Sequence, residues 1–537
     1  MDVADFIVVG SGNTGAMAAQ TLLEGGATVT MLDVGRVDTT YRDLIPDADF
    51  VTIRAGDPGQ HRYFLGDTFE GIPASTVSTG AQLTPPRAHV SELVARFLPV
   101  LSDTFRPQES LAYGGLGNAW GAGCCVYSDS ELREAGLEPA RMRPAYQTVA
   151  DRIGISGAQD DATPYTSAGL TGLQPPPDLD ETCSRLYRRY TAKRNGLRTR
   201  GVSIGRPALA LLTKDQGERK AFAYRDMDFF SDRDRSVYRP WITVDALKSD
   251  PRFRLVDGVL VLRFEEQADA VEVFGLDVRT GERTIHRARR LVLASGALGT
   301  ARIVLRSLGS AGHTLPVLCN PYSYIPCLQP GLVGTEVAPR KMSLAQLAIF
   351  HDPDGTNADV AMGSVYSYRS LMLFRILPQA PIDFVDARIL MRYLMPAITI
   401  VGIHHPERPG PGRSLRLEAF ADSPTGDRLL ADYSLSEAEV RRNADRERLM
   451  IRSLRSLGVW AIKRIQPGMG SSIHYAGTLP FATDGRPFSL DADGRLAGTG
   501  SVSVADGSGF RYLPAKGLTL SLMANAHLVA QEALRRG

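Results

Sequence analysis

The stretch "FIVVGSGNTGAMAAQTLLEGGATVTMLD", residues 6–33, decides the fold class. Residues 6–9 are apolar and β-branched, which predicts a buried strand, and they lead directly into Gly10, Gly12 and Gly15 in G-x-G-x-x-G spacing. The first glycine of such a turn permits the tight bend, the second lets a pyrophosphate approach the backbone, and the third lets the helix pack close to the strand. The following residues, 16–23, predict that helix. The stretch therefore predicts an α/β, Rossmann-like dinucleotide-binding unit.

An acidic residue follows at the end of the second predicted strand, residues 28–32. Asp33 lies 18 residues after Gly15, where a carboxylate accepts hydrogen bonds from an adenosine ribose. A phosphate on that ribose would be repelled, so the site suits FAD or NAD better than NADP. The stretch alone leaves FAD and NAD both open.

Composition limits the classes of partner. The chain has 537 residues, too many for one hydrophobic core, and a formal net charge of +2, which offers no strong field for nucleic acid or an anionic membrane. Five scattered cysteines form no C-x-x-C pair, and the nine histidines show no zinc-binding spacing, so we expect reduced thiols and no metal. The short acidic start predicts no signal peptide and a cytoplasmic protein.

Two later regions predict further elements. Residues 384–405 are the most apolar long region, but Asp386, Arg388, Arg392 and Pro396 interrupt them, which predicts a buried helix followed by a strand rather than a membrane span. His404 and His405 would then point to opposite faces of that strand. Residues 436–458 predict a long amphipathic helix with Ser436 as its N-cap.

Three further segments carry features that point to chemistry. They are the glycine-rich "YGGLGNAWGAGC" at 113–124, the strand-turn-helix pattern "RRLVLASGALGTARIVLRS" at 289–307, and the C-terminal region that begins "HYAGTLP" at 474 and continues through "VADGS" at 504. Together with the N-terminal stretch, and in this order, they resemble the glucose-methanol-choline (GMC) family of FAD-dependent alcohol oxidoreductases. The resemblance covers the whole chain, and it selects FAD over NAD.

The resemblance implies a set of cofactor-binding residues. It assigns the ADP portion to the glycine turn and Asp33, the flavin to the 113–124 loop and the start of the last helix, and the ribityl and pyrophosphate region to the "VADGS" acid. The residues so implied are Gly10, Gly12, Gly15, Asp33, Gly114, Gly115, Asn118, Ala119, Gly121, Gly296, Asp506, Gly507, Leu518 and Thr519. Some members carry a histidine bonded covalently to the flavin where this chain has Ala119, so the FAD is expected to be non-covalent.

His474 matches the catalytic histidine of the family. Oxidation of an alcohol through a flavin needs a base for the hydroxyl proton, and an imidazole suits that task. Most members place a second Asn or His in a later motif, but the aligned stretch here is "PAKGLT", with Ala515 at that position. Either His474 holds the hydroxyl alone, or Lys516 or another residue supplies the second contact. Lys516 near the flavin could also stabilise its reduced form, or could point to solvent.

The substrate is implied only by resemblance, to bacterial members of sugar and aminoglycoside pathways, the paromamine 6'-dehydrogenase type among them. We expect oxidation of a hydroxyl on a sugar or aminoglycoside-type intermediate of antibiotic biosynthesis, with an unidentified electron acceptor. A cationic aminosugar would need carboxylates, which the loop with Asp226, Asp228, Asp232 and Asp234 could supply; the alternative is a solvated loop neutralised by its arginines. Two rival functions are flavin-dependent desaturation or isomerisation of a polyketide, terpenoid or sterol, and non-catalytic binding.

These features predict two interleaved domains. The FAD-binding domain is expected from residues 1–40, 105–150, 240–310 and 465–537, with 41–104 as a lid or connection. The substrate-binding domain is expected from 151–239 and 311–464. Its mostly antiparallel sheet, supplied by segments such as "SLRLEAF" at 414–420 and "AITIVGIHH" at 397–405, is predicted to lie over the flavin.

Overall fold

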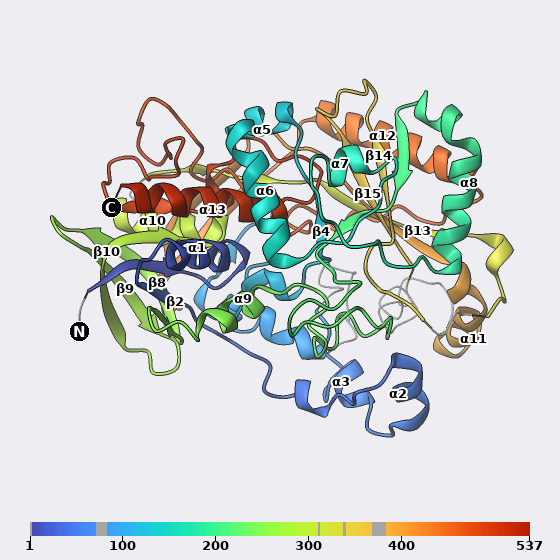
Figure 1. The fold of residues 1–537 in the computed structure, drawn as a ribbon, viewed down its shortest axis with the longest axis horizontal. Helices are drawn as coiled ribbons and strands as arrows, with labels where there is room; N and C mark the ends of the chain where they lie inside the picture. The colour runs from blue at the N-terminus through green and yellow to red at the C-terminus, as the bar shows by residue number, and fades with distance from the viewer. Residues whose placement is uncertain (1–2, 71–82, 310–311, 337–339, 368–382, 537) are drawn as a thin grey trace.

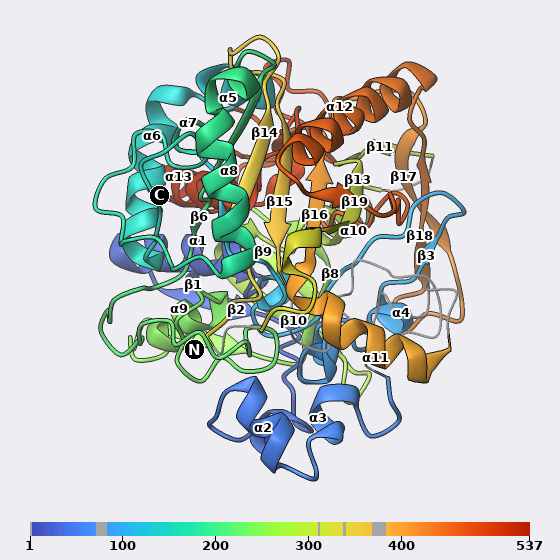
Figure 2. The same cartoon turned by 90° about the vertical axis from the view of Figure 1, so that its right-hand side faces the viewer.

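A computed structural model describes residues 3–70, 83–309, 312–336, 340–367 and 383–536. Two large sheets dominate it (Figures 1 and 2). Both termini lie at the end of the molecule that carries the first sheet, whereas α2 (Phe50–Gly56) and α3 (His61–Leu65) project away from both sheets.

The first sheet has seven strands and a parallel centre. Its order is β7-β2-β1-β10-β9-β8, with β21 pairing to β10, and β9 and β8 join antiparallel. Val8 lies between Met31 of β2 and Val292 of β10, and all three are buried, as expected for strands covered on both faces. The strand bounds are β1 (Ala4–Val9), β2 (Val29–Leu32), β7 (Phe253–Val256), β8 (Val259–Glu266), β9 (Val271–Asp277), β10 (Arg283–Leu293) and β21 (Val502–Val504).

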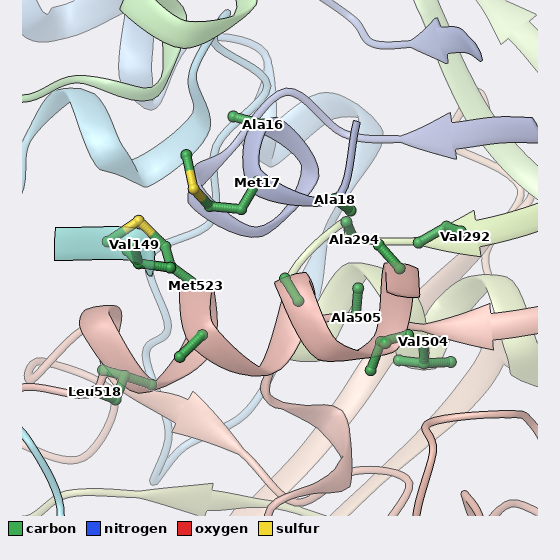
Figure 3. Packing of buried hydrophobic residues seen from close by; sticks show 14 of the residues in the cluster. Ala16, Met17, Ala18, Val149, Val292, Ala294, Val504, Ala505, Leu518 and Met523 are labelled. Atoms are coloured by element: carbon green, nitrogen blue, oxygen red, sulfur yellow. The ribbon is translucent and has the colours of Figure 1, made fainter. Parts of the chain in front are cut away.

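Three helices pack together beside this sheet. They are α1 (Asn13–Glu24), α6 (Pro139–Ile153) and the last helix, α13 (Thr519–Arg535), and Figure 3 shows Met17, Val149 and Met523 meeting among them. A fourth helix, α10 (Ala297–Leu308), packs on β8 and buries Ile303, Val304 and Leu305. The predicted strand-glycine-helix-strand unit and the 289–307 strand-turn-helix are confirmed.

The second large sheet is fully antiparallel, with the order β19-β13-β16-β15-β14-β5. Its residues alternate between two environments, as the two-residue period of a strand requires. One face packs on α8 (Glu181–Arg198) and α12 (Glu437–Ser456) through residues such as Ile325, Val365 and Val401. The other faces a cavity. The bounds are β5 (Val202–Gly205), β13 (Tyr322–Leu328), β14 (Leu347–His351), β15 (Ala361–Tyr366), β16 (Ile398–His404) and β19 (Trp460–Ala461).

The expectation that 414–420 and 397–405 belong to one sheet is wrong. Residues 397–405 supply β16, but β17 (Arg413–Ala419) pairs with β18 (Asp427–Tyr433) in a separate four-stranded sheet, completed by β11 (Leu315–Pro316) and β3 (Val100–Leu101). Both segments have strand patterning, and that patterning carries no information about which strands pair. The domain boundaries remain a prediction.

The long helix is confirmed, and the apolar helix is only partly as expected. The hydroxyl of Ser436 accepts from the backbone N–H of Glu439, whose carboxylate accepts from the N–H of Ser436, so a capping box begins α12. Residues 384–405 do form a helix, α11 (Phe384–Leu394), and then β16. However, α11 is not buried: among its described side chains, Val385 is 61% and Tyr393 56% accessible, whereas Met391 and Leu394 are partly buried against the core.

The remaining elements are short. Two two-stranded pairs join β4 (Gly123–Cys124) to β6 (Ala208–Leu209) and β12 (Leu318–Cys319) to β20 (Tyr475–Ala476). The other helices are α4 (Val94–Phe97), α5 (Asp129–Ala135), α7 (Thr163–Thr166) and α9 (Pro240–Leu247). In the described part of the chain, no helix is both long and apolar enough to cross a membrane.

Candidate active site

A cavity of about 460 Å³ lies where the two large sheets approach each other. One half is formed by the glycine turn before α1, the turn before α10 and the segment from β21 into α13. The other half is formed by the open face of the antiparallel sheet. The turns belong to the carboxyl ends of parallel strands β1 and β10, the edge at which α/β sheets bind their ligands.

The three glycines of the first turn have distinct surroundings. A Cβ on Gly15 would lie 1.8 Å from the carbonyl oxygen of Gly10, and one on Gly10 would lie 2.7 Å from that of Ala294, so these two glycines allow close backbone packing. Gly12, by contrast, has no atom within 4 Å of a built Cβ and lines the cavity. It precedes α1, whose first N–H groups receive no side-chain cap. The turn therefore offers an open helix N-terminus suited to a phosphate.

Asp33 lies at the end of β2 and lines the same half of the cavity. Its carboxylate accepts from the backbone N–H of Ser11 and that of Gly35, each at 2.6 Å. Burial raises the pKa of Asp33 to about 6, because the charged form loses its water. These bonds hold the carboxylate at the cavity wall, within the region expected to meet an adenosine ribose.

The second turn, before α10, supplies the adjacent part of the wall. Gly296, at φ +78°, has no atom within 4 Å of a built Cβ. Asp506 accepts from the Thr300 hydroxyl at 2.6 Å and from the Ser508 N–H at 3.0 Å, and burial raises the pKa of its carboxyl. Two buried polar atoms on the wall, Asn13 Oδ1 and Ser295 Oγ, have no hydrogen-bond partner among the described residues. Buried polar groups are normally paired, so this half fits a polar, phosphorylated ligand such as FAD.

The other cofactor-binding residues divide into wall and support. Gly115, Ala119, Gly121, Gly507, Leu518 and Thr519 line the cavity. Gly15, Gly114 and Asn118 do not: the Asn118 amide donates to the carbonyls of Tyr113 and Gly115, and the N–H of Gly114 donates to the Ser11 hydroxyl at 2.8 Å. These residues hold the turns in shape. Their proposed contacts with a cofactor remain predictions.

His474 lies on the cavity wall beside β20, and Asn320 determines its tautomer. The Asn320 amide nitrogen is surrounded by three backbone carbonyls, those of His405, Leu513 and Pro514, at 2.8–3.2 Å. The amide oxygen is therefore the atom that faces His474 Nδ1, at 3.0 Å. An amide oxygen only accepts, so Nδ1 carries the proton and Nε2 keeps its lone pair. Burial lowers the pKa of His474 to about 4, which leaves the ring neutral and able to accept a proton.

A second imidazole lies against the first. The His404 ring, at the end of β16, stacks on the His474 ring with centroids 4.8 Å apart and planes 21° from parallel. His404 lines the cavity, whereas His405 is buried on the other side of the strand, where its Nε2 lies 3.0 Å from the Glu447 carboxylate. The predicted opposite orientation of these two histidines is confirmed.

Lys516 is not where either sequence hypothesis placed it. Its side chain is fully buried, and its ammonium donates to Glu131 at 2.6 Å and to Asn357 at 2.5 Å. Ala515 and Gly517 line the cavity, but Lys516 does not. Adjacent residues of an extended segment point in opposite directions, so the ammonium points away from the cavity and away from solvent.

The acidic loop does not line the pocket, and only part of it faces solvent: Asp234 is half-buried and lies 3.9 Å from Arg225, as the alternative of a neutralised loop predicts. Asp226 and Asp228 are buried and both bind Ser343, and Asp232 is paired with Arg87 and Arg239. None of the four aspartates lines the cavity. Among the described residues, no group of three or more His, Cys, Asp or Glu could hold a metal ion, and all five cysteines are buried and unpaired.

Sequence reasoning missed the two residues that contact His474. His404 was placed on a strand face, and its pairing with His474 depends on the contact between β16 and the segment before β20. Asn320 is a single asparagine in a short connection, and no local pattern marks it. Only the folded arrangement brings these residues to the base.

Comparison with known proteins points in one direction. No family model matches the chain. A paromamine 6'-oxidase from Streptomyces fradiae is 26% identical, and a 6'''-hydroxyparomomycin C oxidase from Streptomyces lividus is 25% identical; each comparison covers 98% of this chain and 90% of the relative. A C-glycoside 3-oxidase from Microbacterium trichothecenolyticum is 26% identical over 56% of this chain and 53% of its own length.

Among solved structures, a pyridoxine 4-oxidase from Mesorbium loti superimposes with a TM-score of 0.59 over 98% of this chain and 99% of its own, at 15% identity. That similarity shows a shared fold. The predicted resemblance to the glucose-methanol-choline oxidoreductases is thereby confirmed, in sequence along nearly the whole chain and in fold.

Proposed function

We propose that this protein oxidises a hydroxyl group of a sugar or aminoglycoside-type compound to a carbonyl, with non-covalent FAD as the oxidant. One observation carries the proposal: His474 is a neutral imidazole on the wall of the cavity that the glycine turn also lines. Asn320 keeps the ring proton on Nδ1, so Nε2 is free to accept a proton. The relatives named as oxidases of paromamine, 6'''-hydroxyparomomycin C and a C-glycoside support the hydroxyl and the sugar class over desaturation or isomerisation.

The cavity fits this chemistry in two halves. The half with Gly12, Asp33 and Asp506 would hold the nucleotide, and the face with His404 and His474 would meet the substrate. Bound FAD would take up the carbinol hydrogen with both electrons of its C–H bond. Nε2 of His474 would take the hydroxyl proton as the O–H bond breaks and the carbonyl forms.

Asn320 contributes by stabilising the imidazolium that this proton transfer creates. Its oxygen accepts from Nδ1 in both protonation states, so the ring needs no rotation when Nε2 becomes protonated. Because burial disfavours the imidazolium, the proton does not reside on His474 before the substrate arrives.

The first experiment asks what the purified protein binds. The protein should be yellow, and acid precipitation should leave FAD in the supernatant, because Ala119 cannot form a covalent bond to the flavin. A flavin that stays in the pellet would contradict non-covalent binding, and a colourless protein that takes up no FAD would refute the proposal.

The second experiment is an anaerobic titration with paromamine, methyl glucosides and simple alcohols, followed by air. Loss of flavin absorbance with one of these identifies an oxidised alcohol, and the rate at which colour returns separates an oxidase from a dehydrogenase. His474→Ala should keep FAD and lose the rapid reduction by about 10²–10⁴-fold. A variant that is reduced as fast as wild type would remove His474 from the mechanism.

A further inference from the structure

The substrate face has a gap at Ala515, where related enzymes place a second polar group. Ala515 lines the cavity with a methyl group, and Lys516 points away from it. The cavity face of the antiparallel sheet presents mainly aromatic and apolar side chains: Tyr322, Tyr324, Met362, Tyr366 and Ile400. On this face, His404 is the residue that brings ring nitrogens next to His474.

His404 has the contacts of a ligand-binding residue rather than a structural one. Its ring touches two others: His474 at 4.8 Å and Tyr322 at 4.6 Å between centroids. Within the described ranges, neither ring nitrogen has a hydrogen-bond partner, and the half-buried ring lines the cavity. Ring nitrogens that no protein group occupies and that belong to a cavity wall can donate to or accept from a bound ligand.

The relative orientation of the two rings determines what they can bind. A histidine nitrogen bonds in the plane of its ring. Two nearly parallel rings therefore direct their nitrogens within two nearly parallel planes and meet two separate oxygens better than one shared oxygen. A ring compound with hydroxyls on neighbouring carbons offers such a pair of oxygens.

We infer that His404 binds a second oxygen of the substrate, on the carbon next to the one that is oxidised, and that this protein therefore prefers vicinal diols. The inference rests on the proposed function, because His474 is taken as the base for the reacting hydroxyl. It makes His404 a specificity residue that replaces the missing group at position 515 from a different strand.

A pair of small probes tests this without knowledge of the natural substrate. Cyclohexanol and cis-1,2-cyclohexanediol differ by one neighbouring hydroxyl. Binding to the FAD-loaded protein is measured by isothermal titration calorimetry without oxygen, and reduction of the flavin is followed separately. Wild type should bind the diol about tenfold more tightly, the value of one hydrogen bond.

The key variant is His404→Phe, which keeps a flat ring against His474 and removes both nitrogens. It should bring the ratio of the two dissociation constants close to one and leave cyclohexanol binding nearly unchanged; His404→Ala should lose the preference as well. His313→Phe is the matched control, because the His313 ring lies against Phe488, with centroids 4.6 Å apart, and is not part of the cavity wall. It should keep the tenfold ratio.

The outcomes separate this inference from the proposed function. If wild type is reduced by an alcohol but the diol preference is missing or survives His404→Phe and His404→Ala, His404 does not have this role and the oxidation chemistry stands. If no alcohol of either panel reduces a fully loaded flavin, the proposed function fails. If, in that case, the FAD-loaded wild type also binds cyclohexanol and cis-1,2-cyclohexanediol equally tightly, the inference about His404 is overturned as well.

Discussion

Replacing Asn320 with Asp tests the assignment of His474 as a neutral base. The substitution puts a carboxylate in place of the amide oxygen that lies 3.0 Å from His474 Nδ1. A negative charge at this distance favours the imidazolium, and such pairs shift a pKa by about 1–3 units. The pKa of His474 should rise from about 4 toward 5–7, which corresponds to about 1–4 kcal/mol of added preference for the charged ring.

The assay is the pH dependence of flavin reduction, measured anaerobically with the best alcohol of the panel. The base must be neutral to accept a proton, so the rate falls as the pH drops below its pKa. In Asn320→Asp, this acid limb should move up by about 1–3 pH units. Asn320→Leu is the control, because it removes the same hydrogen bonds without adding charge.

The two variants separate charge from structural damage. Both lose the three bonds from the amide nitrogen to backbone carbonyls, so both should be less stable than wild type. Only the aspartate should move the acid limb upward. Equal rate losses in both variants with an unshifted profile would refute the assignment, and Asn320 would then be a purely structural residue.

Three further predictions concern the cofactor turn, the buried lysine and acid stability. Gly15→Ala should disrupt folding, because the new Cβ would lie 1.8 Å from the carbonyl oxygen of Gly10. Gly12→Ala should leave the melting temperature of the FAD-free protein nearly unchanged, because no atom lies within 4 Å of its Cβ, and should weaken FAD binding in a fluorescence titration. Equal loss of stability in the two would contradict this reading of the turn. Lys516→Met leaves Glu131 as an unpaired buried charge and should cost about 3–5 kcal/mol in urea unfolding. Normal stability together with lost reduction would instead restore Lys516 to the active site. The pKa of His474 is about 4 in the folded protein and 6.5 for the ordinary group, so between these pH values the unfolded protein binds one more proton than the folded one. The group therefore contributes up to about 3 kcal/mol to the free energy of unfolding. This contribution is complete above pH 6.5 and is lost as the pH falls toward 4. Unfolding of FAD-free wild type and His474→Phe between pH 4 and 7 checks this, and parallel curves would contradict it.

The acidic loop does not supply the carboxylates that a cationic aminosugar would need. Asp226, Asp228 and Asp232 are held by Ser343 and by two arginines, so none is available to an aminosugar. Among the residues that the structure describes, three acids line the cavity: Asp33, Glu109 and Asp506. Asp33 and Asp506 belong to the half with the nucleotide turns, and Glu109 is paired with Arg302. From the described part of the cavity wall, we expect recognition on the substrate face to depend on neutral hydrogen-bonding groups and aromatic rings.

Elements whose physics is local can be predicted from the amino-acid sequence alone. The glycine turn needs a conformation and a close backbone approach that only glycine permits. The capping box of α12 uses two residues three positions apart. In residues 289–307, the apolar pattern changes from that of a strand to that of a helix. Those features, in order along the chain, were enough to indicate the family, the fold and His474 as the candidate base.

Which side chains meet at His474, by contrast, depends on the tertiary fold. Asn320 and His404 reach His474 across 154 and 70 residues of sequence, and Lys516, adjacent to a cavity residue, is drawn away by Glu131, which is 385 residues distant. Strand patterning gives each residue a face but not a partner, which is also why β17 was assigned to the wrong sheet. Pairing between distant segments depends on how all the buried surfaces pack at once, and no local sequence pattern encodes that.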